Sequence, residues 1–156
     1  MIDTSAFKSG VGYAKFLEQI GKAMSECPEY SYTFKELVEE VLQFKGWKQR
    51  DLEEATCFTH KTMNRCLNEE TFNKQTLISI CVALGIDLVL TMIFLMSRGI
   101  LLNPITNEID NKYMIFISKN VATKNIENKG DGFDRIIKCN EFIQERQFFL
   151  GGMDIK

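Results

Sequence analysis

The longest apolar stretch of the chain is the feature that most restricts its fold. Residues 76–96 contain a single charged side chain, that of Asp87. A stretch of this length can cross a bilayer as one helix. Asp87 would then lie near the bilayer centre, at a cost of about 2.5–3.5 kcal/mol. Gly85 and Asp87 instead supply a helix stop followed by a helix cap, so we expect two short buried helices end to end.

The composition is that of a globular protein with its own core. Of the 156 residues, 45% are hydrophobic and 26% are charged, and the formal net charge is −2. This length suits one domain or two small ones, and it suffices for a core without disulfides or a structural metal. The charge balance excludes a basic coat that binds nucleic acid non-specifically, so any such contact must come from a local patch.

The cysteines and the N-terminus indicate the cell compartment. Five cysteines are scattered without a C-x-x-C spacing, which is typical of reduced thiols in a cytosolic protein. Residues 1–10 lack the basic segment and the apolar segment of a secretory signal. We therefore expect a cytoplasmic protein that does not enter a membrane.

Hydrophobic periodicity predicts helices almost throughout the chain, and strand signals are weak. Thr33 and Glu36 have the spacing of a capping box, and the helix that they begin ends at Gly46. The segment Gly130-Asp131-Gly132 is a turn signal ahead of the last helix. The expected helices are 11–26, 34–45, 49–56, 60–68, one that begins after Asn73, 88–97, one around 109–117, and 133–143.

Two of these helices form a recognisable pair. Segments 49–56 and 60–68 are joined by only three residues and have a helix on either side, which describes a helix-turn-helix unit. Residues 34–86 resemble the Cro/repressor-type (XRE) helix-turn-helix family of bacterial and phage regulators. The resemblance rests on a Gly-x-x-Gln-x-x-Leu start, a capped recognition helix and an apolar helix that ends in Leu-Gly-apolar. These are GWKQRDL at 46–52, FTHKTMNR at 58–65 and TLISICVALGI at 76–86.

The resemblance implies an all-α, lambda-repressor-like five-helix DNA-binding module with additional N- and C-terminal helices. It also implies that Gln49 donates to a phosphate at the start of its helix. The family usually has a small residue at the position of Glu53 and a glycine at that of Cys57. We expect Glu53 near the helix crossing and Cys57 in a left-handed conformation. The expected parts are an N-terminal segment 1–32, the module 33–102 and a C-terminal helical extension 103–156.

The second helix of the pair carries a polar arc. At about 100° per residue, five of its polar side chains fall within about 140°, and none of them is a carboxylate. Arginine and asparagine pair with guanine and adenine edges, and the first turns of a recognition helix enter the major groove. We expect His60, Lys61 and Asn64 at base edges, and Arg65 at a base or a phosphate. The predicted DNA-binding residues are Gln49, Thr59, His60, Lys61, Asn64, Arg65 and Asn68.

These observations predict a sequence-specific, DNA-binding transcriptional regulator and not an enzyme. We expect it to bind double-stranded DNA as a homodimer, held by helix 88–97 with or without the C-terminal extension. No cofactor is implied. Cys57, His60 and Cys66 lie close in sequence, but a structural zinc site needs four ligands, so we expect no metal site. One alternative stays open: the same fold binds a protein partner, as an antitoxin or adaptor does, which Glu53 and the acidic helix 34–45 favour.

Overall fold

The part of the chain that the structure describes consists of helices and connecting segments. The computed structural model describes residues 32–68, 73–122 and 128–152, and these contain no strand. The all-α prediction is therefore confirmed for these residues, and the helix expected at 11–26 lies outside them. The helices are α3 (Phe34–Lys45), α4 (Gln49–Thr56), α5 (His60–Leu67), α6 (Lys74–Leu84), α7 (Leu88–Met96), α8 (Glu108–Lys119), α9 (Lys129–Ile143) and the 3-10 helix η1 (Arg146–Phe148).

Hydrogen bonds from nearby side chains, together with glycines, determine where most of the helices begin and end. Thr33 Oγ1 accepts from the Glu36 backbone N–H at 3.1 Å, and Glu36 Oε1 accepts from the Thr33 N–H at 3.1 Å, which completes the predicted capping box. Asn73 and Asp87 each accept a backbone N–H from the first turn of α6 and α7. Gly85 ends α6 with φ +70°. These side chains satisfy backbone groups that have no partner within a helix.

The apolar stretch 76–96 is divided between α6 and α7, as predicted. Every residue of α6 from Leu77 to Leu84 is buried. On α7 the buried residues are Leu90, Thr91, Phe94 and Leu95. No helix among the described ranges has the length and apolar character needed to cross a membrane.

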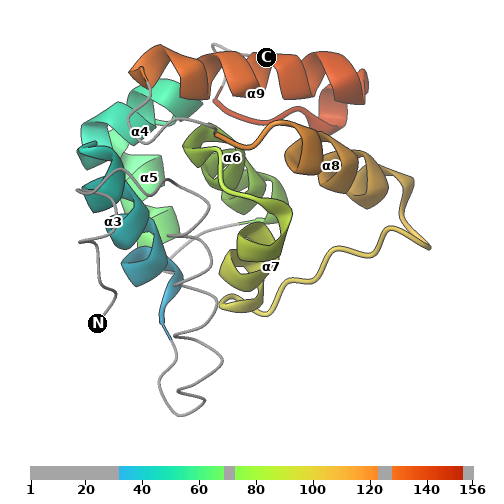
Figure 1. Cartoon of the computed structure of the whole chain (residues 1–156), viewed down its shortest axis with the longest axis horizontal. Coiled ribbons are helices and arrows are strands. Elements are labelled where there is room, and N and C mark those ends of the chain that lie inside the picture. The colour runs from blue at the N-terminus through green and yellow to red at the C-terminus, as the bar shows by residue number, and fades with distance from the viewer. Residues whose placement is uncertain (1–31, 69–72, 123–127, 153–156) are drawn as a thin grey trace.

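Helix α9 covers the module on one side. It lies across α4 and α6, with α8 beside it (Figure 1). Ile136, Cys139 and Ile143 of α9 are fully buried. Arg135 donates through Nε to the Val82 carbonyl and through Nη2 to that of the next residue, both at 2.9 Å, at the end of α6. The C-terminal helices therefore share one hydrophobic core with α3 to α7.

The turn predicted at Gly130-Asp131-Gly132 is wrong, because these residues lie in the first turn of α9. Gly132 packs where α9 crosses α4 and α6. A Cβ atom at this position would lie 2.6 Å from the Ala83 carbonyl oxygen and 3.2 Å from the Ala55 Cβ. This glycine therefore permits the close approach of helices and does not make a turn.

Candidate nucleic-acid interface

Helix α5 is attached to the rest of the fold by one face and by its two ends. Met63, Cys66 and Leu67 are buried. At the start of the helix, Thr59 Oγ1 accepts the backbone N–H three residues further on at 3.1 Å. At its end, Arg98 Nη2 donates to the Leu67 carbonyl at 3.0 Å. The opposite face of α5 is thereby held toward solvent.

The polar arc predicted on α5 lies on this outward face. His60, Lys61, Arg65 and Asn68 are exposed, and Asn64 is half-buried. Lys61 and Arg65 make no hydrogen bond or ion pair with any residue in the described ranges. Both cations are therefore open to a ligand that approaches this face.

Three of the predicted residues and Glu53 form a closed set of hydrogen bonds, which we call the polar ring. Gln49 Nε2 lies 2.9 Å from Glu53 Oε2 and 2.8 Å from Asn64 Oδ1. His60 Nδ1 lies 2.8 Å from the same Glu53 oxygen, and His60 Nε2 lies 3.0 Å from Asn64 Nδ2. The polar ring consists of Gln49, Glu53, His60 and Asn64, and it joins the start of α4 to the outward face of α5.

The polar ring determines which nitrogen of His60 carries the proton. A carboxylate only accepts hydrogen bonds and an amide nitrogen only donates them. His60 Nδ1 therefore donates to Glu53, and His60 Nε2 accepts from Asn64. The side chain of Glu53 is 12% exposed and that of His60 is 72% exposed. A shielded carboxylate thus lies behind an exposed imidazole.

Asn68 and Thr59, the remaining predicted residues, serve the ends of α5. Asn68 Nδ2 donates to the Asn64 carbonyl at 2.8 Å, and its Oδ1 accepts from Lys35 Nζ at 3.3 Å. Thr59 is the N-cap. The bond from Lys35 to Asn68 adds a third cation at the end of the outward face.

The turn between α4 and α5 is closed by the C-terminal end of the described chain. Cys57 has φ +57°, which confirms the predicted left-handed conformation. The Gly152 N–H donates to the Thr56 carbonyl at 2.7 Å, and the Gly151 N–H donates to Ser79 Oγ at 2.9 Å. Residues 151 and 152 therefore link the turn of the helix pair to α6.

The role of Glu53 goes beyond what the sequence predicted. Its position near the helix crossing is confirmed, but its bonds to two predicted DNA-binding residues were not foreseen. The four-residue spacing from Gln49 could have predicted that pair within α4. The bond to His60 crosses the turn, and only the angle between α4 and α5 brings these groups together.

The thiol of Cys66 on α5 is buried. Burial raises the pKa of the Cys66 thiol to about 11, so it remains protonated at neutral pH. His60 is occupied on both ring nitrogens by Glu53 and Asn64. In the ranges that the structure describes, no three His, Cys, Asp or Glu side chains are grouped to hold a metal ion.

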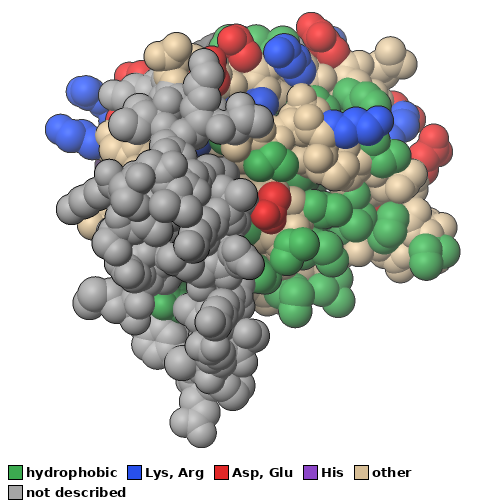
Figure 2. Space-filling model, viewed as in Figure 1, with side chains coloured by type: hydrophobic (Ala, Val, Ile, Leu, Met, Phe, Trp, Pro, Cys, Tyr) green, Lys and Arg blue, Asp and Glu red, His purple; other side chains and the backbone are tan. Residues whose placement is uncertain are grey.

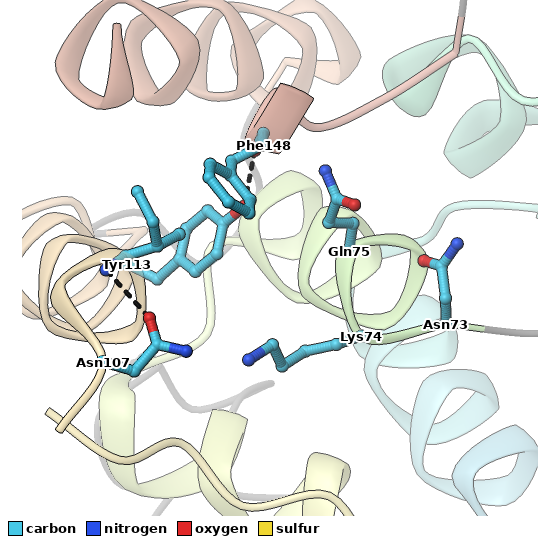
Figure 3. Close-up of a pocket in the computed structure, with 7 residues that line it drawn as sticks. Asn73, Lys74, Gln75, Asn107, Tyr113 and Phe148 are labelled. Atoms are coloured by element: carbon cyan, nitrogen blue, oxygen red, sulfur yellow. Dashed lines mark hydrogen bonds between the residues drawn. The ribbon is translucent and has the colours of Figure 1, made fainter. Parts of the chain in front are cut away.

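A small pocket lies between the start of α6, the start of α8 and η1 (Figure 3). Its volume is about 210 Å³. The Lys74 ammonium at its edge is paired with Asp110 at 2.6 Å, and the Tyr113 hydroxyl donates to the Phe148 carbonyl at 2.5 Å. The charged group and the phenol of this pocket are therefore already paired with groups of the protein. It is lined by Asn73, Lys74, Gln75, Asn107, Ile109, Tyr113 and Phe148.

Comparison with known families identifies the same region. Residues 38–89 match the Cro/C1-type HTH DNA-binding domain. The matched segment runs from within α3 to the start of α7, and it includes the polar ring and the whole of α5. No curated protein and no solved structure matches the chain.

Proposed function

Because residues 38–89 match the Cro/C1-type HTH DNA-binding domain, we propose that this chain is a cytoplasmic, sequence-specific regulator of transcription. In this proposal α5 docks in the major groove of double-stranded DNA, and α4 lies over the phosphate backbone. The contacts come from Lys61, Arg65 and Asn64 on α5, with His60 beside them. Thr59 and Asn68 complete the predicted interface, and Gln49 takes part through its bond to Asn64.

The exposed cations of α5 carry this proposal. Lys61 and Arg65 project from a helix that is held from behind, and they have no partner in the described chain. Helix α5 itself carries no carboxylate. Lysine and arginine donate to guanine O6 and N7 and to phosphate oxygens. Charged groups on a fixed helix are suited to both kinds of contact.

A second copy of the chain would compensate for the small number of phosphate contacts available to one copy. Residues 33–86 contain seven basic and eight acidic side chains, so few phosphate contacts are available to one copy. Val89, Met96, Leu101 and Ile105 are 68%, 57%, 67% and 92% exposed. Hydrophobic side chains gather over the surface near α7 and α8 (Figure 2). We propose that this apolar surface is the dimer interface, which would place two α5 helices at half-sites about one helical turn apart.

The test of DNA binding is its salt dependence. Fluorescence polarisation would compare the wild type with the Lys61→Ala/Arg65→Ala variant on genomic and random-sequence duplexes. We expect a log–log salt slope of several units in the wild type, reduced by about one to two in the variant. The control is Lys119→Ala/Lys138→Ala, which removes two exposed charges from α8 and α9 and should keep the wild-type slope. No salt-sensitive duplex binding by the wild type would reject the proposal.

The dimer has its own test. Sedimentation of Val89→Lys/Met96→Lys should give a monomer where the wild type gives a dimer, because both lysines would place charge in an apolar contact. A monomeric wild type at micromolar concentration would contradict this part of the proposal.

A protein partner is the second candidate function. The carboxylate of Glu53, which lies behind the outward face of α5, and the exposed apolar side chains of α7 both suit a protein ligand. A flat salt slope that Lys61→Ala/Arg65→Ala does not change would favour this alternative over DNA.

A further inference from the structure

We propose that Glu53 is a specificity-determining positioning residue, which orients the amide of Asn64 for an adenine edge through Gln49 and His60. This inference rests on the proposed function, because it concerns the base that α5 reads. It assigns Glu53 a role in recognition although its carboxylate itself donates nothing to DNA. The side chain acts only through its two neighbours in the polar ring.

Both arms of the polar ring end on Asn64, on opposite ends of its amide. Gln49 Nε2 donates to Oδ1 at 2.8 Å, while His60 Nε2 accepts from Nδ2 at 3.0 Å. Rotating the amide by half a turn would place two donors against each other at Gln49. It would also place two acceptors against each other at His60. The Asn64 side chain therefore has one stable orientation as long as both arms are held.

Glu53 holds both arms with a single oxygen. Its Oε2 accepts from Gln49 Nε2 at 2.9 Å and from His60 Nδ1 at 2.8 Å. The bond to Nδ1 keeps the proton on that nitrogen, and this leaves Nε2 as the acceptor that Asn64 needs. Without the carboxylate, the imidazole is free to carry its proton on Nε2. Neither Gln49 nor His60 would then define the amide orientation.

Counting hydrogen-bonding positions shows what the polar ring leaves for DNA. An asparagine amide has two N–H donors and two acceptor lone pairs. The polar ring uses one of each on Asn64, so one donor and one acceptor remain. This pair matches N7 and N6–H₂ of adenine in the major groove. Gln49 by contrast uses both of its amide hydrogens inside the protein, so it cannot donate to a phosphate while the ring is closed.

The first experiment observes the polar ring in the free protein. The chain contains one histidine, so its imidazole nitrogens give unambiguous signals in two-dimensional ¹⁵N NMR. In the neutral form of the ring we expect the proton on Nδ1 in the wild type and in Glu53→Gln, which keeps an acceptor oxygen. Glu53→Ala should show a mixture of tautomers. An Nε2-protonated ring in the wild type would overturn the proposal without involving DNA.

The second experiment measures base preference by selection from a library of randomised half-sites. The wild type and Glu53→Gln should prefer adenine at one position, and Glu53→Ala should lose about tenfold of that preference. The control Glu54→Ala removes the same charge from the neighbouring exposed residue, and it should change affinity without changing preference. Equal preference profiles for Glu53→Ala and Glu54→Ala would show that Glu53 contributes charge alone, which would overturn the inference. If neither the wild type nor any variant binds duplex DNA, but the NMR spectrum shows the proton on Nδ1, the proposed function is rejected and the polar ring is still supported.

Discussion

Helices α6 and α7 come from one apolar stretch of sequence, but they have different surroundings. From Leu77 onward α6 is buried, because α9 lies across it and α4 and α7 pack beside it. Val89 and Met96 of α7 remain 68% and 57% exposed. From Leu77 onward α6 is apolar except for Ser79, and α7 is apolar except for Thr91, so composition does not distinguish these two segments. An apolar helix is therefore buried or left exposed according to what the rest of the chain packs against it.

The largest expected effect is on the free energy of unfolding, when a buried side chain of α6 is shortened and compared with an exposed side chain of α7. Ile80→Ala on α6 should lower the free energy of unfolding by about 2–5 kcal/mol, because Ile80 is fully buried and its removal leaves a cavity. Val89→Ala on α7 should change it by less than about 0.5 kcal/mol in the monomer. Urea denaturation measures both. Equal losses would mean that α7 is covered in solution.

The next largest effect on stability comes from disturbing the contact between α9 and α6. Gly132→Ala should destabilise the fold by about 1–3 kcal/mol, because the new Cβ would lie 2.6 Å from the Ala83 carbonyl oxygen. Gly130→Ala is the matched control in the same helix, since nothing lies within 4 Å of a Cβ there. It should be neutral or stabilising by up to about 1 kcal/mol. If thermal unfolding shows the two variants to be alike, α9 does not pack tightly on α6.

A smaller effect follows from the thiols buried around α6. Burial raises the pKa of the Cys81 thiol on α6. It also raises the pKa of Cys66 to about 11 and that of Cys139 to about 12. A raised pKa in the folded state gives stability that is complete below the unfolded pKa and is lost as the pH rises above it. As the pH rises from 8 to 10, each buried thiol should therefore lower the free energy of unfolding by about 1 kcal/mol. Urea denaturation of Cys139→Ala should show a shallower decline than the wild type. An unchanged decline would contradict the burial of this thiol.

The smallest effect concerns the caps, which should not distinguish the two helices. Asn73 and Asp87 each bond a backbone N–H of the first turn, at 2.8 Å on α6 and 2.7 Å on α7. Asn73→Ala and Asp87→Ala should each cost about 1 kcal/mol in urea denaturation, because the bonds are alike. A loss several times larger for one cap would indicate that the difference between α6 and α7 begins at their ends.

The predictions that succeeded depend on short-range interactions. The capping box of Thr33 and Glu36, the caps Asn73 and Asp87, and the left-handed Cys57 involve groups within a few residues of each other. Such geometry follows from backbone hydrogen bonding, which is the same in any fold. The failure at Gly130-Asp131-Gly132 has the opposite cause. A glycine signals a turn when only neighbouring residues are considered, but here α6 and α4 require a position without a Cβ.

The sequence by itself determined the helices from α3 to α8, most of their ends, the division of the apolar stretch and the polar arc of α5, but not the start of α9. All of these follow from spacings of three to four residues along one helix. Only the tertiary structure decided that Glu53 bonds His60 across the turn, that α9 covers α6, and that α7 stays exposed. Each of these three features depends on how different helices are placed relative to one another. Their contact depends on helix crossing angles, which are set by the packing of the whole core and not by any local pattern.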